Sequence, residues 1–232
     1  RTGVEVRRLV RRRAGWRLVT SAGDFSARTI VNCAGLHADR VARMAGLEPD
    51  VRIVPFRGEY MFLRDERAHL VNGLIYPVPD PALPFLGVHL TSTVDGRVEA
   101  GPNAVPAFAR EGYRFLDVDL ADLAETLAFP GAWKLGARYW RHGAFEIYRS
   151  LRRPVFVRSL QRLMPGLRPE DVVPGGSGVR AQAVGRDGRL VDDFAVLTTD
   201  TAMHVLNAPS PAATASLAIG RQLAEDLAPL LA

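Results

Sequence analysis

Residues 29–45, TIVNCAGLHADRVARMA, contain the strand, turn and helix that decide the fold class of this chain. The first five residues predict a short buried strand, and Ala34 and Gly35 end it. Residues 37–45 then have the apolar spacing of a helix. A small-residue turn between a strand and a helix lets a pyrophosphate approach the helix N-terminus. We therefore expect an α/β unit that suits a nucleotide.

The segments on either side of this unit predict further strands and helices. Apolar alternation, proline and β-branched residues predict strands at 4–10, 16–20, 52–63, 74–90, 99–103, 179–183 and 195–198, with a turn at 23–24 between two strands. Helical spacing predicts helices at 119–126, 133–149, 156–164 and 212–231.

This order of elements predicts a split domain in a mixed α/β (α+β) fold. We expect residues 1–50 and 171–232 to form parts of a Rossmann-like nucleotide-binding domain. Residues 51–170 would then be an inserted substrate domain with an antiparallel sheet and helices.

The composition, 47% hydrophobic and 24% charged, is that of a globular chain and excludes a disordered one. No apolar run is long enough to span a membrane, and residues 1–13 have no signal-peptide core. The single cysteine, Cys33, excludes a disulfide framework. These features predict a cytoplasmic protein.

The formal net charge is +5, and the densest basic cluster lies at residues 7–13. Aromatic residues do not interleave with its arginines, which argues against a nucleic-acid partner. A solvated pair of strands is the simplest interpretation of the cluster. A peripheral contact with anionic lipid at the inner face of a membrane is the alternative.

Three arginines lie in local sequences that suggest distinct roles. Arg57 in PFRGEY and Arg180 in GVRAQ are both flanked by small residues, and a guanidinium donates two parallel hydrogen bonds to a carboxylate. Each of these two arginines could bind a substrate carboxylate or form a structural ion pair with a nearby Asp or Glu. Arg158, in a predicted helix, fits a structural role better.

His89, in the apolar segment FLGVHLT, is the histidine best placed for chemistry. Burial would keep its imidazole neutral, as a general base requires, and the alternative is a hydrogen-bonded core histidine. The five histidines show no metal-ligand spacing, so we expect no metal. No serine lies in a nucleophile elbow, which argues against a hydrolase.

The segment NAPSPAATASLAIG, residues 207–220, combines a polar proline turn with the start of the last predicted helix. The amides of Ala212, Ala213 and Thr214 would face an electronegative group, because helix N-termini carry partial positive charge. A flavin edge that becomes anionic on reduction would suit this turn. An ordinary capped helix is the alternative.

Taken together, these segments resemble the D-amino-acid-oxidase-like family of FAD-dependent oxidoreductases. VNCAG is shared across the wider family. IVPFRGEYMFL, FVRSLQRLMP and LVDDF also carry the resemblance. YPVPDPALPFLGVHLT, AGPNAV, GVRAQA and NAPSPAATASLAIG are more specifically similar to the family's hydroxyglutarate-oxidising branch. The resemblance implies oxidation of the 2-hydroxyl of L-2-hydroxyglutarate to the ketone of 2-oxoglutarate. Hydride would pass to the flavin, and electrons then to oxygen, a quinone or another acceptor.

The resemblance also assigns roles to individual residues. It implies that Arg180 binds a substrate carboxylate, with His89 inferred as the base and Arg57, Tyr76 and Gln182 as weaker candidates for the distal carboxylate. For FAD it implies contacts by Val4, Cys33, Ala34, Gly35, Asn207, Ala208, Pro209, Ser210, Pro211, Ala212 and Ala213.

The chain departs from the family pattern in one respect, because it has no GxGxxG loop. We therefore expect it to correspond to the C-terminal half, or more, of such an enzyme. Two other interpretations stay open, a glycine- or sarcosine-type amine oxidase and a non-catalytic remnant. Two cationic anchors favour a diacid substrate, and a scaffold would need neither His89 nor Arg180.

Overall fold

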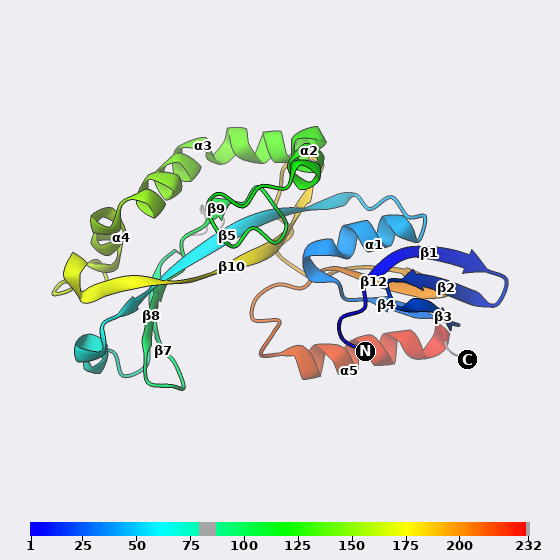
Figure 1. The fold of residues 1–232 in the computed structure, drawn as a ribbon, viewed down its shortest axis with the longest axis horizontal. Coiled ribbons are helices and arrows are strands. Elements are labelled where there is room, and N and C mark those ends of the chain that lie inside the picture. The colour runs from blue at the N-terminus through cyan, green and yellow to red at the C-terminus, as the bar shows by residue number, and fades with distance from the viewer. Residues whose placement is uncertain (79–86, 231–232) are drawn as a thin grey trace. The chain divides into compact units, whose positions relative to one another are not determined.

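The computed structural model describes residues 1–78 and 87–230, and the chain divides into two compact units (Figure 1). Unit 1 comprises Arg1–Val54 and Ala181–Ala232, and unit 2 comprises Pro55–Arg180. Residues 171–180, which we had assigned to the nucleotide domain, thus belong to unit 2. The mixed α/β character of the fold is confirmed, while the functions assigned to the two parts stay predictions.

Unit 1 holds two three-stranded sheets. The first is an antiparallel meander of β1 (Val6–Arg12), β2 (Gly15–Thr20) and β3 (Gly23–Ala27). The second has the order β11 (Ala195–Thr199), β12 (Ala202–Asn207) and β4 (Ile30–Asn32), and β12 runs parallel to β4.

Helices follow the strands of unit 1 at two places. The 3₁₀ turn Gly35–His37 and helix α1 (Ala38–Met44) come directly after β4, so the predicted strand, turn and helix are confirmed. Helix α5 (Ser216–Leu227) and the 3₁₀ turn Ala228–Leu230 lie near the C-terminus.

Unit 2 contains a six-stranded sheet whose main path is β10-β5-β8-β7-β6. In that order the strands are β10 (Val172–Gly185), β5 (Val51–Leu63), β8 (Val98–Gly101), β7 (His89–Ser92) and β6 (Leu74–Ile75), and β9 (Val105–Pro106) also pairs with β5. The unit boundaries fall within β5 and β10.

The helices of unit 2 are α2 (Leu120–Ala128), α3 (Pro130–Leu151) and α4 (Arg153–Leu160), with 3₁₀ turns at Asp65–Leu70 and Pro169–Asp171. Asp119 caps α2 by accepting hydrogen bonds from two backbone amides, at 2.9 Å each. Phe156, Val157 and Leu160 of α4 belong to one buried cluster with the sheet residues Leu63, Leu90, Val98 and Val172.

Several predicted boundaries were wrong, most clearly those of two helices and one turn. Helix α5 begins at Ser216 instead of residue 212, because residues 210–215 form turns in which the Thr214 hydroxyl donates to the Pro211 carbonyl at 2.9 Å. Helix α4 lies at Arg153–Leu160 instead of 156–164, since Pro154 starts it in the first turn. The predicted turn at 23–24 lies at 21–22, and β3 already begins at Gly23.

The short strand β9 and the strand β12 were not predicted, and β10 was predicted only in part. All six residues of β12 are buried, so the alternation that reveals a strand is absent. The predicted strand 179–183 covers only part of β10 and omits the glycine-rich residues 172–178 at its start. Gly175 there lies where a Cβ would be 2.9 Å from the Tyr60 carbonyl oxygen of β5. Only glycine permits this close approach. Part of the predicted strand 74–90, residues 79–86, lies outside the described residues.

Within the described residues, no helix combines the length and apolar content needed to cross a membrane.

Leu160→Ala should lower the free energy of unfolding by about 2–5 kcal/mol, because Leu160 is fully buried between α4 and the sheet. Urea unfolding followed by circular dichroism measures this change. Leu217→Ala, at an exposed position of α5, is the control and should change stability by less than about 0.5 kcal/mol. Equal losses in both variants would contradict the assigned core.

Candidate functional site

An imidazole and two phenol side chains lie close together on the unit 2 sheet. The rings of Tyr76 and His89 stack with their centroids 4.1 Å apart and their planes 15° apart. His89 of β7 pairs with Gly101 of β8, and a Cβ at Gly101 would lie 2.8 Å from the Glu59 carbonyl oxygen. Because Gly101 also has a φ of 138°, glycine is required where β8 meets β5.

The hydrogen bond of His89 fixes which ring nitrogen can accept a proton. Its Nδ1 lies 3.2 Å from the carbonyl oxygen of Gly87. A carbonyl oxygen only accepts hydrogen bonds, so Nδ1 carries the hydrogen and Nε2 keeps its lone pair. Burial lowers the pKa of His89 below its usual 6.5; Arg180 adds to this, while the Gly87 bond and Glu99 oppose it. The neutral ring can therefore act as a base at Nε2.

Arg180 of β10 is exposed and supplies positive charge to this group of rings. Burial raises the pKa of Tyr60; Arg180 opposes this, and Glu99 adds to it. The Tyr60 hydroxyl therefore stays protonated at neutral pH and can donate a hydrogen bond. The structure thus brings Arg180, His89 and Tyr76 together as candidates, and adds Tyr60, which the sequence interpretation missed although it lies in the same PFRGEY segment as Arg57.

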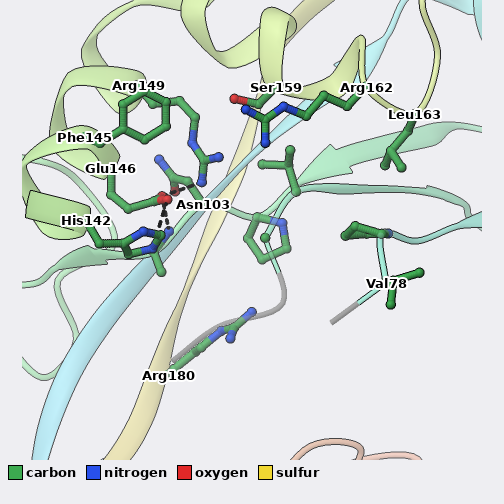
Figure 2. Close-up of a pocket in the computed structure, with 15 residues that line it drawn as sticks. Val78, Asn103, His142, Phe145, Glu146, Arg149, Ser159, Arg162, Leu163 and Arg180 are labelled. Atoms are coloured by element: carbon green, nitrogen blue, oxygen red, sulfur yellow. Dashed lines mark hydrogen bonds and ion pairs between the residues drawn. The ribbon is translucent and has the colours of Figure 1, made fainter. Parts of the chain in front are cut away.

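A cavity of about 320 Å³ lies in unit 2, and Arg180 is one of its lining residues (Figure 2). Its other polar lining comes from the segment after β8, from α3 and from α4 and its C-terminal end: Asn103, His142, Glu146, Arg149, Ser159 and Arg162. Arg57, Tyr76 and His89 do not line it, although their neighbours Pro77 and Val88 do. The sequence did not point to the polar residues of α3 in this cavity.

Glu146 organises the α3 side of the cavity. Its carboxylate lies between His142 and Arg149 (Figure 2), 3.5 Å from His142 Nε2 and in an ion pair with the Arg149 guanidinium. It also accepts a hydrogen bond from the backbone amide of Ala104 at 3.1 Å. Glu146 and Arg149 are both buried, so their charges balance inside the wall of the cavity. Arg162, in contrast, is exposed and has no hydrogen-bond or ion-pair partner among the described residues.

Arg57 has a different environment from the one that a substrate-binding role requires. It is only 1% exposed, and its guanidinium pairs with Glu59 at 2.9 Å and donates to the Arg114 carbonyl oxygen at 2.9 Å. The ring of Phe115 lies 5.2 Å from the guanidinium carbon. This geometry favours the structural ion pair over the substrate carboxylate.

In unit 1 all three residues of the turn Cys33–Gly35, which follows β4, are exposed. The Asn32 side chain holds it: its Oδ1 accepts from the Ala34 amide at 3.1 Å, and its Nδ2 donates to the Ala38 carbonyl at 2.8 Å. Gly35 has a φ of 51° with open space around it. An open turn at the end of a strand that pairs in parallel fits the passage of a dinucleotide.

The other predicted cofactor residues lie in unit 1 with mixed environments. Asn207 is buried, and its Nδ2 donates to the carbonyl oxygens of Val191 at 3.0 Å and Asp193 at 2.8 Å, so its amide supports the fold. Most of the loop at 208–213 is exposed, whereas Val4 is half-buried before β1. Gln182, a predicted substrate residue, also lies in unit 1 and donates to the Ala183 carbonyl at 3.1 Å.

Comparison with known proteins identifies the family. The model of the FAD dependent oxidoreductase (DAO) family matches residues 1–226, so the chain belongs to this family of FAD-dependent oxidoreductases. Curated relatives carry a more particular name. The chain is 53% identical to an L-2-hydroxyglutarate dehydrogenase of Indibacter alkaliphilus, over 89% of this chain and 52% of the relative. It is 48% identical to the L-2-hydroxyglutarate dehydrogenase of Escherichia coli K12, over 90% of this chain and 50% of the relative. It is 47% identical to the mitochondrial L-2-hydroxyglutarate dehydrogenase of Mus musculus, over 88% of this chain and 45% of the relative.

The chain spans about half the length of the curated relatives it matches. Among solved structures, it is similar to a reduced L-alpha-glycerophosphate oxidase of Mycoplasma pneumoniae with FAD bound, with a TM-score of 0.66 and 18% identity over 94% of this chain and 48% of that one. It is also similar to a glycerol-3-phosphate dehydrogenase of Bacillus halodurans complexed with FAD, with a TM-score of 0.53 and 11% identity over 97% of this chain and 38% of that one. These two likenesses support the fold, and the family establishes FAD as the cofactor.

An NMR titration of the histidine ring protons should give His89 a pKa below 6.5, with the ring neutral above its own pKa and charged below it. Arg180→Met should raise this pKa, because it removes a positive charge that disfavours the imidazolium. Arg158→Met, on the exposed side of α4, is the matched control and should leave it unchanged. If Arg180→Met left the pKa of His89 unchanged, the two side chains would not lie close together.

Proposed function

We propose that this chain serves the FAD-dependent oxidation of L-2-hydroxyglutarate to 2-oxoglutarate. The observation that carries the proposal is the neutral, lone-pair-bearing His89 beside the cationic Arg180 in unit 2. The names of relatives about half identical to this chain support the same substrate. Oxidation removes the hydroxyl proton and the C2 hydride of the acid, and FAD, when bound, is the hydride acceptor.

In this proposal each side chain of unit 2 has one task. His89 Nε2 takes the proton of the 2-hydroxyl, for which it must come within about 3 Å of that oxygen. Arg180 binds the carboxylate next to the reacting carbon with a charge-assisted pair of hydrogen bonds. The Tyr60 hydroxyl, kept protonated, can donate to an oxygen of the substrate.

The second carboxylate of the substrate needs a second cation. Arg57 is committed to Glu59, so we assign this role to Arg162, which lines the same cavity as Arg180 and has no acidic partner in the described structure. Figure 2 shows the two guanidinium groups on different sides of the cavity. In unit 1, the open turn at Cys33–Gly35 and the loop at 208–213 would hold FAD.

We also propose oxygen or a quinone as the final electron acceptor, and a peripheral contact with the inner face of a membrane. The net charge of +5 supports a contact with an anionic surface.

The direct test adds FAD to the purified chain, removes unbound flavin and records the visible spectrum before and after anaerobic L-2-hydroxyglutarate. Bleaching of bound flavin by this acid, but not by glycine or sarcosine, is the expected result. Bleaching by an amino acid instead would favour an amine oxidase. If the folded chain retains no flavin, the same spectra are recorded on a version extended at its N-terminus to the full length of the relatives, and no bleaching there would overturn the proposal.

Arg180→Ala should weaken binding of 2-oxoglutarate about 10- to 100-fold, because hydrogen bonds to a charged group contribute about 1.5–3 kcal/mol. Arg162→Ala should weaken 2-oxoglutarate similarly but leave a monocarboxylate, 2-oxobutyrate, unaffected. Isothermal titration calorimetry measures both, with Arg158→Ala as the control. Equal weakening of both ligands by Arg162→Ala, or none, would exclude Arg162 as the anchor of the second carboxylate.

A further inference from the structure

Helix α3 turns large apolar side chains toward solvent. Trp133 and Trp140 are 63% and 65% exposed, and Tyr148 and Leu151 are 53% and 60% exposed. Residues 140, 147 and 151 are separated by seven and four positions, so Trp140, Ile147 and Leu151 form one stripe on the C-terminal half of the helix. Figure 1 shows α3 at the outer edge of unit 2, with no other labelled element of this unit on the side away from the strands.

The exposed charges on α3 and α4 have one sign. Between residues 130 and 162 the only acidic side chain is Glu146, which is buried and paired with Arg149. The other basic side chains of this segment are all exposed: Lys134, Arg138, Arg141, Arg152, Arg153, Arg158 and Arg162. This surface therefore presents positive charge without exposed negative charge from α3 or α4.

Aromatic and aliphatic residues flanked by arginine favour one kind of partner. Tryptophan and tyrosine rings prefer the interface of a bilayer, and basic side chains attract anionic headgroups. Arg141 already lies over the Trp140 ring, with its guanidinium carbon 5.7 Å from the ring centroid, so the ring and the charge reach the same place. A nucleic acid would use the charge and the rings, but it offers nothing apolar to Ile147 and Leu151.

We propose that α3, together with the start of α4, is the surface by which this protein docks on an anionic phospholipid bilayer. Trp133, Trp140, Ile147 and Leu151 would enter the headgroup region, and Arg138, Arg141 and Arg153 would contact lipid phosphates. The inference rests on the membrane contact proposed above and locates that contact on α3 and the start of α4. It does not depend on the oxidation chemistry.

The test is co-sedimentation of the chain with vesicles of phosphatidylcholine containing 30% phosphatidylglycerol, where the unaltered chain should bind. Substituting Arg138, Arg141 and Arg153 with glutamate should reduce binding at least tenfold. The matched control substitutes Arg8, Arg12 and Arg13, exposed residues of the N-terminal basic cluster, with glutamate. Both triple variants change the net charge by the same amount, and the control should lose less than threefold.

Tryptophan fluorescence gives a second measurement that needs no variant. Trp16 is buried in unit 1, so quenching by lipids brominated in the acyl chain should report Trp133 and Trp140. Quenching by the anionic vesicles, and a smaller quenched signal in Trp140→Ala in which only Trp133 reports, would support the proposal. Binding lost equally in both triple variants, or binding without quenching, would leave a membrane contact but overturn this surface. No binding by the unaltered chain would overturn the contact itself, while the spectral test of oxidation stays separate.

Discussion

The carboxylate of Glu59 is the constraint on which the arrangement of unit 2 depends. One oxygen pairs with the buried Arg57 guanidinium, and the other accepts from Asn103 Nδ2 at 2.8 Å and from the Ser150 hydroxyl of α3. The Glu59 amide donates to Asn103 Oδ1 at 2.7 Å. One side chain thus joins strand β5, the segment after β8 and helix α3. An unpaired Arg57 would leave a buried charge, at a cost of about 3–5 kcal/mol. The cavity wall formed by Asn103 and Ala104 therefore relies on this pair.

Much of the fold could be predicted because its local patterns agree with its tertiary contacts. The alternation in β1, the proline- and aromatic-rich β5 and the strand, turn and helix at 29–45 were all visible in the sequence. Strand β12 was not, since a strand buried on both faces loses its period. The glycines of β10 serve its close approach to β5, and that neighbour cannot be seen from β10 alone.

The candidate site was predictable only in part, for a related reason. Local surroundings drew attention to His89 and Arg180, and the structure places them close enough for the arginine to influence the imidazole. Arg57 had the same kind of surroundings, but its acidic partner lies only two residues away, and the sequence could not show that both side chains turn toward each other. Glu146 lies in α3 and Arg162 in the turn that follows α4, and in the sequence both look like polar residues of a solvated face. Only the packing of α3 and α4 brings them to one cavity.

Protonation of the buried His204 imidazole would affect the turn at Cys33–Gly35 through Asn32, which contacts both. Asn32 Nδ2 donates to His204 Nδ1 at 3.1 Å, so the ring hydrogen is on Nε2, a buried atom with no partner among the described residues. Burial lowers the pKa of His204 below its usual 6.5. The unfolded chain therefore takes up this proton more readily than the folded one, and unit 1 loses stability as the pH falls below 6.5. A second ring proton, on Nδ1, would face the Asn32 amide hydrogens and oppose this hydrogen bond. Because the same Asn32 side chain holds the turn at Cys33–Gly35, protonation of His204 would reach the turn through Asn32.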